Sequence, residues 1–319
     1  MDTFLQTQLG INLALQQIGG LTAVMQGFSF LGTEDFFLIF LSFIYFGFDS
    51  TLGARLFVML LFSAQVNSLL KIAIHLPRPS WIDPSVKAIA TESTYGLPSG
   101  HAQIAANTWT FVANETKRTW AWVAAIILIL LVSLSRLYLG AHFLSDVIGG
   151  WLVGVIILMI VWRVEKPVTG WLAKLNLWSQ IGVAFSAAVV VALLGIIVRA
   201  AVAASPDPAA WAGFAKDARN LDSIISGAGA IFGVSVGLAM MNRFARFDAK
   251  GAWWKRVARF AIGVIGVVAI RFGLGAIFPN HPEAIAFIFR FVRYALLLWW
   301  LVFVTPWVCL KIKLAERGG

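Results

Sequence analysis

A histidine and an aspartate stand four residues apart in the stretch Ser135–Asp146, within an otherwise apolar part of the chain. Residues at that spacing lie one helical turn apart, so the carboxylate of Asp146 can accept the imidazole N–H of His142. That hydrogen bond would fix the tautomer and leave the other ring nitrogen free as a nucleophile. Arg136 in the same stretch offers a planar guanidinium for two phosphate oxygens. Alone, the pattern also fits a buried His–Asp pair that only stabilises a helix junction.

A second stretch, Lys71–Pro79, carries two cations seven residues apart. Two helical turns separate Lys71 from Arg78, so both side chains can point to the same side. Pro79 disfavours helix at the residue before it, which predicts that the span ends there. Two cations at the outer end of one helix would form an anion clamp. The simpler alternative is that both reach toward the membrane interface, as Lys and Arg near span ends commonly do.

A third stretch, Tyr95–His101, has the pattern of a helix start. Pro98 ends the preceding segment, and Ser99 can act as the N-cap of the next helix. Gly100 allows close backbone approach, so that N–H groups of the first turn can bind a phosphate oxygen. His101 stands in that turn and can give a proton near neutral pH. The alternative is a plain capped helix start with an interfacial histidine.

Together the three stretches indicate a phosphoryl-transfer site. Hydropathy places the main candidates at the outward ends of their apolar runs: Lys71, Arg78, His101, Arg136 and His142. Charges with only structural roles would be scattered instead. Preorganised positive charge supplies most of the catalysis in phosphoryl transfer, which is what three converging cations would provide. Tyr95, Gly96 and Gly140 flank these stretches and are second-rank candidates for shaping the phosphate pocket.

The elements that must position these residues are membrane-spanning helices. The 319 residues are 60% hydrophobic and only 13% charged, which is too apolar for an ordinary soluble domain. Several apolar runs are long enough to cross a hydrocarbon core of about 30 Å. Lipid offers no partner for a bare backbone group, so these runs must be helical. The predicted fold class is all-α, a polytopic transmembrane bundle with a six-helix core and four C-terminal transmembrane helices.

Hydropathy divides the chain into a catalytic core, residues 1–165, and a four-helix extension, residues 166–319, which follows the polar stretch 163–167. Glutamines interrupt the segment 4–30, which is predicted to lie in the membrane interface rather than to cross. Further core helices are expected at about 33–48, 52–75, 100–114, 119–140 and 142–162. Spans of the extension are expected at roughly 179–203, 222–242, 257–278 and 284–309.

The distribution of basic residues predicts the orientation. The net charge is +10. The basic residues cluster between apolar spans rather than on one soluble face, which argues against a nucleic-acid partner. The following basic residues fall on one side of the spans: Arg55, Lys117, Arg118, Arg163, Lys166, Lys174, Arg243, Arg246, Lys250, Lys255, Arg256, Lys311, Lys313 and Arg317. By the positive-inside rule that side is cytoplasmic, so the candidate site faces the periplasm or exterior across the cell inner membrane. The first Lys or Arg is Arg55, so no cleavable signal is expected. A single cysteine, Cys309, allows no intrachain disulfide.

These stretches resemble the three signature motifs of the type 2 phosphatidic acid phosphatase superfamily. The match covers about residues 71–146 without departure at a motif position: Lys71-x6-Arg78-Pro79, Pro98-Ser99-Gly100-His101 and Ser135-Arg136-x5-His142-x3-Asp146. The resemblance implies a compact helical core that uses no metal. It also implies that His142 attacks phosphorus to form a phosphohistidine, that Asp146 orients it, and that His101 protonates the leaving oxygen. The implied phosphate-binding groups are Lys71, Arg78, Arg136 and the backbone of Ser99 and Gly100. The order and length of the extension resemble, more weakly, sphingosine-1-phosphate phosphatases and glucose-6-phosphatases.

The expected function is metal-independent hydrolysis of a phosphate or diphosphate on a lipid, such as undecaprenyl diphosphate, a phosphatidic acid-type lipid or a sphingoid phosphate. The expected partners are that substrate and the surrounding membrane lipids; the sequence leaves the oligomeric state open. One alternative is a lipid phosphotransferase, in which a second lipid or sugar takes the phosphate from His142. Another is a transporter whose charges line a substrate path, a reading kept open by Arg199, Arg271, Arg290 and Arg293 in the extension.

The absence of a cofactor in this scheme gives a direct test. Three basic side chains take the place that Mg²⁺ fills in kinases, so phosphate release from a lipid substrate should persist in excess chelator. Loss of activity with EDTA, restored by added Mg²⁺, would count against the mechanism.

Overall fold

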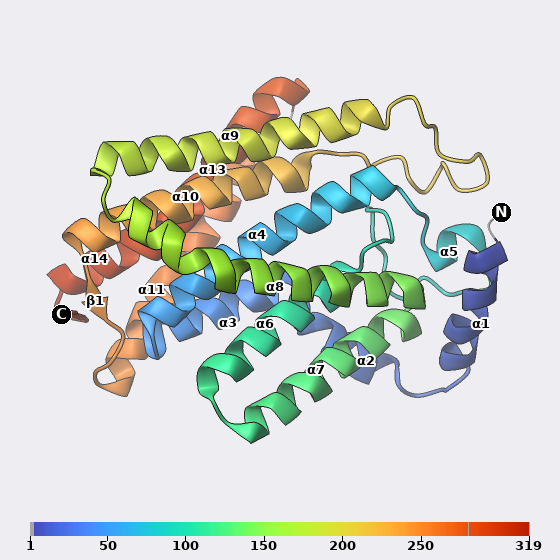
Figure 1. The fold of residues 1–319 in the computed structure, drawn as a ribbon, viewed down its shortest axis with the longest axis horizontal. Coiled ribbons are helices and arrows are strands. Elements are labelled where there is room, and N and C mark those ends of the chain that lie inside the picture. Colours follow the sequence, from blue (N-terminus) through green and yellow to red (C-terminus); the bar gives the residue numbers. More distant parts are fainter. Residues whose placement is uncertain (1–2, 280, 319) are drawn as a thin grey trace. The chain divides into compact units, whose positions relative to one another are not determined.

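The computed structural model describes residues 3–279 and 281–318, and these residues are almost entirely helical (Figure 1). Residues up to 172 form eight helices: α1 (Thr3–Gln16), α2 (Thr22–Phe30), α3 (Glu34–Gly47), α4 (Ser50–Ile74), α5 (Pro79–Ile82), α6 (Gly100–Thr116), α7 (Thr119–Tyr138) and α8 (Leu144–Leu172). The later residues form α9 (Leu177–Ala201), α10 (Asp222–Phe244), α11 (Trp253–Ala269), η1 (Ile270–Leu274), α12 (Gly275–Ile277), α13 (Glu283–Trp299), η2 (Trp300–Val304) and α14 (Thr305–Lys311). Two short strands, β1 (Phe247–Asp248) and β2 (Glu316–Arg317), pair antiparallel.

This architecture confirms the predicted all-α transmembrane fold. Within the described residues, seven helical stretches are long and apolar enough to cross a membrane. Helices α2 and α3 form a further candidate, a pair bent by 52° that can make one broken span. Four of the seven stretches lie in the predicted extension, beginning at Leu177, Asp222, Trp253 and Glu283.

The helix expected at about 142–162 extends further than predicted, because α8 continues through the polar stretch 163–167 to Leu172 with Pro167 inside the helix. A proline there removes one backbone hydrogen bond, a loss that exposed residues at a helix end can replace with water. Glu165 also receives two hydrogen bonds from the guanidinium of Arg55, which fixes this part of the helix. The segment 4–30 forms two helices instead of one, since Gly20 at φ +79° stands between α1 and α2. Its interfacial placement stays a prediction.

Backbone contacts divide the chain into two compact units whose sequences are interleaved. The first unit comprises Met1–Phe37, Val66–Arg163 and Ile196–Asn220. The second comprises Leu38–Gln65, Val164–Gly195 and Leu221–Gly319. Every site residue predicted from the sequence belongs to the first unit. The domain boundary at residue 165 stays a prediction.

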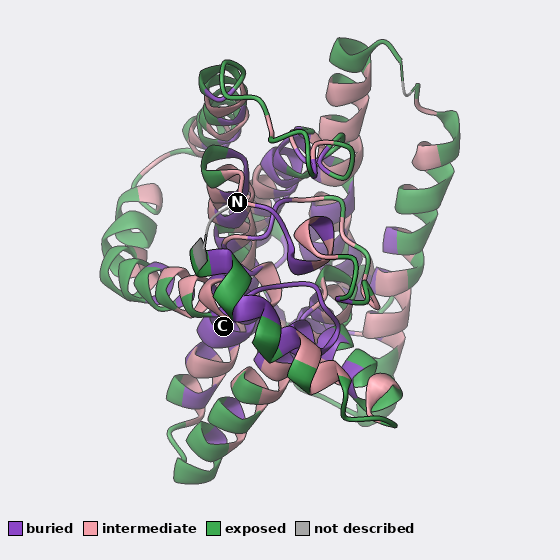
Figure 2. Ribbon diagram, turned by 90° about the vertical axis from the view of Figure 1, so that its right-hand side faces the viewer, coloured by how far each residue is buried: buried purple, intermediate pink, exposed green. Residues whose placement is uncertain are grey.

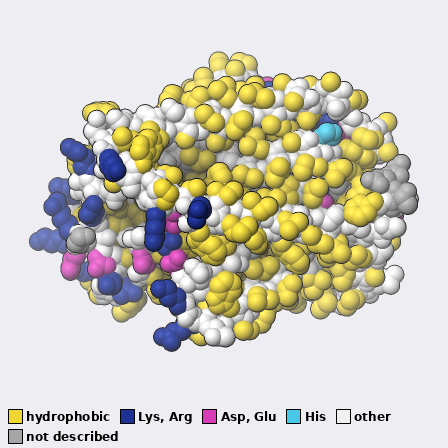
Figure 3. Space-filling model, viewed as in Figure 1, with side chains coloured by type: hydrophobic (Ala, Val, Ile, Leu, Met, Phe, Trp, Pro, Cys, Tyr) yellow, Lys and Arg dark blue, Asp and Glu magenta, His cyan; other side chains and the backbone are white. Residues whose placement is uncertain are grey.

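The surface of the chain suits a lipid environment. Figure 2 shows exposed positions along whole lengths of helices, and many of them are large hydrophobic residues such as Leu152, Phe185 and Ile265. In Figure 3 hydrophobic side chains cover most of the visible face, while Lys and Arg gather at one end of it. Apolar side chains exposed in such numbers are favourable in contact with lipid tails and unfavourable in water.

Within the second unit, glycines on one face of α10 allow close approach of α13. A Cβ atom added at Gly233 would lie 2.1 Å from the carbonyl oxygen of Ala295, and one at Gly229 would lie 2.3 Å from that of Phe291. These glycines are four residues apart and therefore share a helix face. In a membrane, where no hydrophobic effect drives helices together, such close packing is a main source of association.

We expect Gly233→Val to destabilise the protein by about 1–3 kcal/mol, because the side chain would collide with backbone that cannot rotate away. The measurement is the thermal unfolding midpoint of the full-length protein in detergent. Gly182→Val in α9 is the matched control, since nothing lies within 4 Å of a Cβ atom at Gly182. Equal unfolding midpoints for the two variants would show that the α10–α13 contact is not tight.

Candidate active site

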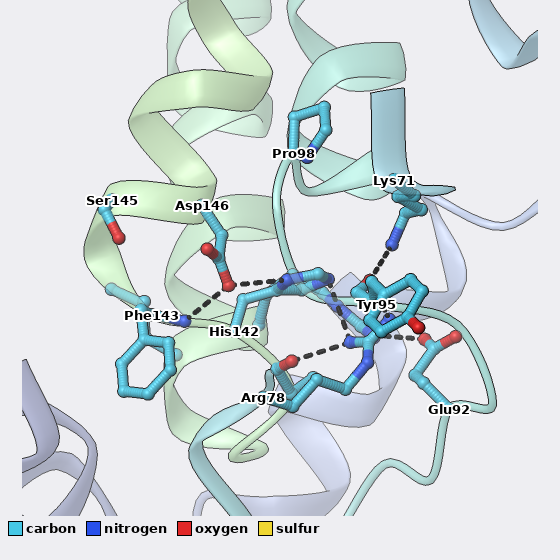
Figure 4. A network of polar contacts seen from close by, with 12 residues as sticks. Lys71, Arg78, Glu92, Tyr95, Pro98, His142, Phe143, Ser145 and Asp146 are labelled. Atoms are coloured by element: carbon cyan, nitrogen blue, oxygen red, sulfur yellow. Dashed lines mark hydrogen bonds and ion pairs between the residues drawn. The ribbon is translucent and has the colours of Figure 1, made fainter. Parts of the chain in front are cut away.

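His142 lies at the centre of a buried polar cluster in the first unit (Figure 4). His142 is 1% exposed and lies in the turn between α7 and α8. Nδ1 lies 3.2 Å from Oδ2 of Asp146, and the same oxygen accepts the backbone N–H of Phe143 at 3.0 Å. The carboxylate is thus held by the helix start and in turn orients the ring. In the tautomer that this contact favours, Nδ1 carries the proton and Nε2 carries the lone pair.

Arg78 reaches the cluster by a route that differs from the predicted one. Helix α4 ends at Ile74, and Arg78 is the extended N-cap residue of α5, so helical periodicity does not bring it beside Lys71. Its Nη1 lies 3.3 Å from Nε2 of His142 and donates to the carbonyl of Ala141 at 2.7 Å. The prediction that the two cations converge is nevertheless met, because both bind the same short segment.

That segment is Thr94–Tyr95, whose backbone carbonyls face the two cations. The carbonyl of Tyr95 accepts from Nζ of Lys71 at 2.6 Å and from Nη2 of Arg78 at 3.1 Å. The carbonyl of Thr94 accepts from Nε of Arg78 at 2.6 Å, and its hydroxyl accepts from both cations. Neutral carbonyl dipoles therefore fix two positive charges in place without neutralising them.

Helix α6 begins where the sequence predicted. Ser99 is its N-cap residue, as predicted, although its side chain makes no capping hydrogen bond. Its N–H instead donates to the carbonyl of Asp146 at 2.9 Å, which ties α6 to α8. Among the described residues its buried hydroxyl has no hydrogen-bond partner and is available to an oxyanion.

Two glycines of the site make room for specific neighbours. A Cβ atom at Gly100 would lie 3.1 Å from Oδ1 of Asn67, whose amide donates to the carbonyl of Pro98 at 3.2 Å. A Cβ atom at Gly32 would lie 2.8 Å from Cδ2 of His101, so the imidazole packs against this turn. His101 is in the first turn of α6, where the sequence placed it.

Arg136 is 2% exposed and faces a carboxylate that the sequence motifs did not reveal. Its Nη2 pairs with Oε1 of Glu92, and its Nη1 donates to the hydroxyl of Ser29. Its Nε is buried and has no partner among the described residues, which leaves one donor for a ligand. Burial disfavours the charged form of Glu92, but Arg78 and Arg136 outweigh it and lower its pKa to about 2. Glu92 stays anionic beside the cations.

Both histidines are neutral in this environment. Burial, followed by the charges of Arg78 and Lys71, lowers the pKa of His142 well below its usual value. Burial and the charge of Arg136 lower the pKa of His101 to about 3. A neutral His142 keeps its lone pair, as a nucleophile must. A phosphate anion bound among these cations would offset their charge and raise the pKa of His101, which favours its protonation when substrate is present.

Asparagine and glutamine residues of α1 support the turn that carries His142. The amide of Asn12 donates to the carbonyls of Leu137 at 2.8 Å and of His142 at 3.0 Å. Oε1 of Gln8 accepts the N–H of Ser145 at 2.8 Å. Sequence reasoning treated these polar residues only as interruptions of an apolar segment. The repeated amide side chains in this apolar segment were the sequence signal for such contacts, because buried amides need hydrogen-bond partners.

The arrangement can bind a tetrahedral oxyanion beside a nucleophile. Lys71, Arg78 and Arg136 supply positive charge, and His142 is held from both ring nitrogens. Within the part of the chain that is described, no group of three His, Cys, Asp or Glu side chains is arranged to hold a metal ion.

Comparison with known proteins places this site in a family. The model of the PAP2 superfamily matches residues 52–169, which include all the predicted site residues. The model described as "PAP2 superfamily phosphatase, transmembrane extension" matches residues 225–317.

Several characterised proteins are similar over the matched region. Sphingosine-1-phosphate phosphatase 2 of Homo sapiens is 32% identical over 138 residues, which cover 41% of this chain and 34% of that protein. Undecaprenyl-diphosphatase of Sulfolobus acidocaldarius is 33% identical over 104 residues, covering 32% of this chain and 50% of that protein. Phosphatidylglycerophosphatase B of Bacillus subtilis is 29% identical over 154 residues, covering 44% and 73%. The matched region thus spans only a third to a half of the first two relatives.

A solved structure is also similar, although too remotely to bear on the site. It is the crystal structure of a transmembrane PAP2 type phosphatidylglycerolphosphate phosphatase from Bacillus subtilis, 24% identical with a TM-score of 0.47, covering 53% of this chain and 89% of that one. The two family models together account for the site-bearing helices and for most of the later spans. The chain belongs to the PAP2 superfamily and carries its transmembrane extension.

Proposed function

We propose that this protein is a membrane lipid phosphatase that works through a phosphohistidine on His142. The observation that carries the proposal is the buried imidazole held between the carboxylate of Asp146 and the guanidinium of Arg78, within a ring of cations. A neutral, oriented nitrogen next to fixed positive charge is what an attack on a phosphate anion requires.

The reaction proceeds in two displacements. Nε2 of His142 attacks phosphorus, the bond from phosphorus to the lipid oxygen breaks, and His101 gives a proton to that oxygen. Water then attacks the phosphohistidine, His101 takes a proton from the water, and the P–N bond breaks to release inorganic phosphate. Lys71, Arg78, Arg136, the hydroxyl of Ser99 and the N–H of Gly100 stabilise the charge on the phosphoryl oxygens in both steps. The N–H of Ser99, which the resemblance also implied, is bound to the carbonyl of Asp146 and does not take part.

Two contacts of the cluster must change when phosphate binds. Nη1 of Arg78 lies on the lone-pair side of His142 and has to move from Nε2 to a phosphoryl oxygen. Glu92 holds Arg136 where the phosphate is expected, so the phosphate must displace or share that contact. Without substrate, the anionic carboxylate of Glu92 thus supplies part of the negative charge that the phosphate supplies when it binds.

The substrate class is a phosphate monoester or diphosphate attached to a lipid. The relatives are named for sphingosine-1-phosphate, undecaprenyl diphosphate and phosphatidylglycerophosphate, which differ in tail and headgroup but share a terminal phosphate on a lipid. A site at the end of membrane spans suits such a substrate, because the tail can stay in the bilayer while the headgroup is cleaved.

The active site is proposed to face the periplasm or exterior across the cytoplasmic membrane. Helix α7 begins directly after Lys117 and Arg118 and carries Arg136 in its last turn, so the basic turn and the site lie at opposite ends of one helix. Basic connections are retained on the cytoplasmic side, which leaves the site end outside.

Replacing the nucleophile should abolish turnover. We expect His142→Gln to lower phosphate release by at least about a thousandfold, because no other group on the attacking side can form the P–N bond. Asp146→Asn should lower it by a smaller factor, since the ring remains but loses its orienting charge. The assay measures inorganic phosphate released by detergent-purified protein from undecaprenyl diphosphate, phosphatidic acid, phosphatidylglycerol phosphate and sphingosine-1-phosphate.

His281→Gln is the matched control, because His281 is exposed and belongs to the unit that does not hold the site. It should leave turnover unchanged. Turnover retained by His142→Gln refutes the nucleophile assignment, and label recovered on a second lipid instead of as free phosphate identifies a phosphotransferase.

The orientation can be tested with single cysteines in a Cys309→Ser background. Ala88→Cys should react with a membrane-impermeant maleimide in intact cells, because the 87–90 segment hydrogen-bonds to Leu139 at the site end of α7. Thr119→Cys, exposed at the opposite end of α7, should react only after permeabilisation. The reverse pattern of labelling would place the site in the cytoplasm.

A further inference from the structure

Residues 202–220, here called the connecting segment, join α9 to α10 and lie outside both family matches. They nevertheless belong to the same compact unit as the active site. The contacts of this segment give it a specific role.

The side chain of Tyr95 is where the connecting segment meets the site. Its ring is fully buried against Trp81 and Trp211, with centroids 6.2 Å and 6.4 Å away, and Ala215 and Ala218 complete the cluster. Three of these four neighbours of Tyr95 come from the connecting segment and the fourth, Trp81, comes from α5, so the phenol is enclosed by apolar groups on its flanks.

The hydroxyl of Tyr95 is held by an ion pair of the connecting segment. It donates to both carboxylate oxygens of Asp207, at 2.9 Å and 3.0 Å, and accepts from Nε of Arg219 at 2.8 Å. Nη2 of Arg219 donates to Asp207 at 3.0 Å, so each of the three side chains hydrogen-bonds to the other two. Burial is the main cause that raises the pKa of Tyr95 to about 12, so the hydroxyl keeps its proton at neutral pH.

Arg219 is itself fixed by the backbone of the connecting segment. Its Nη1 donates to the carbonyl of Val202 at 2.7 Å, and its Nη2 donates to that of Ser205 at 2.6 Å. Together with Asp207 and Tyr95, these contacts engage every nitrogen of the guanidinium. Such a set holds a side chain in one geometry far better than a single exposed ion pair does.

The backbone of Tyr95 faces the other way, toward the phosphate-binding cations. Its carbonyl is the acceptor shared by Lys71 and Arg78, at 2.6 Å and 3.1 Å. Tyr95 thus links two clusters. Its side chain is held by hydrogen bonds and packing from the connecting segment, and its carbonyl sets the position of two cations of the site.

We propose that Arg219 and Asp207 are positioning residues of the active site, acting through Tyr95. This inference rests on the proposed function, because it assigns the two cations to phosphate binding. The pair fixes the Tyr95 side chain, and the Tyr95 carbonyl fixes Nζ of Lys71 and Nη2 of Arg78. Of these two cations, only Nη1 of Arg78 then has to turn, from Nε2 of His142 to a phosphate oxygen. A segment outside the matched family core thereby sets the affinity of the site for phosphate.

The test is a double-mutant cycle on the binding of orthovanadate, a phosphate mimic, to the full-length protein in detergent, measured by isothermal titration calorimetry. Tyr95→Phe keeps the ring in its apolar cluster and removes only the hydroxyl. Arg219→Gln removes the partner. Each should weaken orthovanadate binding roughly tenfold, as expected for loss of a hydrogen bond involving a charged group.

The double variant should bind within about twofold of the weaker single variant, because both changes break the same link. Lys216→Gln, a change at an exposed position of the same segment, is the matched control and should bind as the wild type does. The thermal unfolding midpoint is recorded for every variant, since a merely structural role would lower the midpoint and leave the affinity of the folded protein unchanged.

Single variants that bind orthovanadate as tightly as the wild type overturn the positioning role and leave the phosphatase proposal standing. Losses that multiply in the double variant also overturn it, because independent effects do not pass through one hydroxyl. A wild-type protein that binds no orthovanadate and releases no phosphate from any lipid overturns both proposals.

Discussion

The burial of three cations around one imidazole is the constraint on which the rest of the first unit depends. Lys71, Arg78 and Arg136 are each at most 8% exposed, and charge removed from water is unfavourable unless polar groups replace the water. Backbone carbonyls of Thr94, Tyr95 and Ala141 replace it for two of them, and Glu92 does so for the third. Loops that would otherwise be connections are therefore shaped as ligands for the protein's own charges.

The sequence predicted the helices and the set of converging residues well, because both follow from local patterns. Apolar runs of span length can hardly be anything but helices in lipid, and four-residue spacing brings His142 to Asp146 directly. The backbone position from which Arg78 reaches the site was not predictable in this way, since it depends on where α4 ends. Glu92, Asn12 and Tyr95 were missed or ranked low because each acts through a partner distant in sequence, and no spacing rule records such a contact.

Family membership and structural grouping divide the chain differently. The family matches end at residue 169 and resume at 225, whereas the compact unit that holds the site includes residues 196–220. A residue outside both matches can therefore lie within two contacts of Lys71 and Arg78, as Arg219 does through Tyr95. The segment between the two matches is accordingly part of the unit that holds the site.

The turn at Gly140 determines how far Arg136 stands from His142. Gly140 has φ +68°, and a Cβ atom there would lie 2.4 Å from the carbonyl oxygen of Lys87, so both its conformation and its surroundings require glycine. The N–H of Ala141 closes this turn on the carbonyl of Arg136. The separation between Arg136 and His142 is thus set by the geometry of the backbone. Its length therefore cannot be tuned by exchanging side chains in the turn.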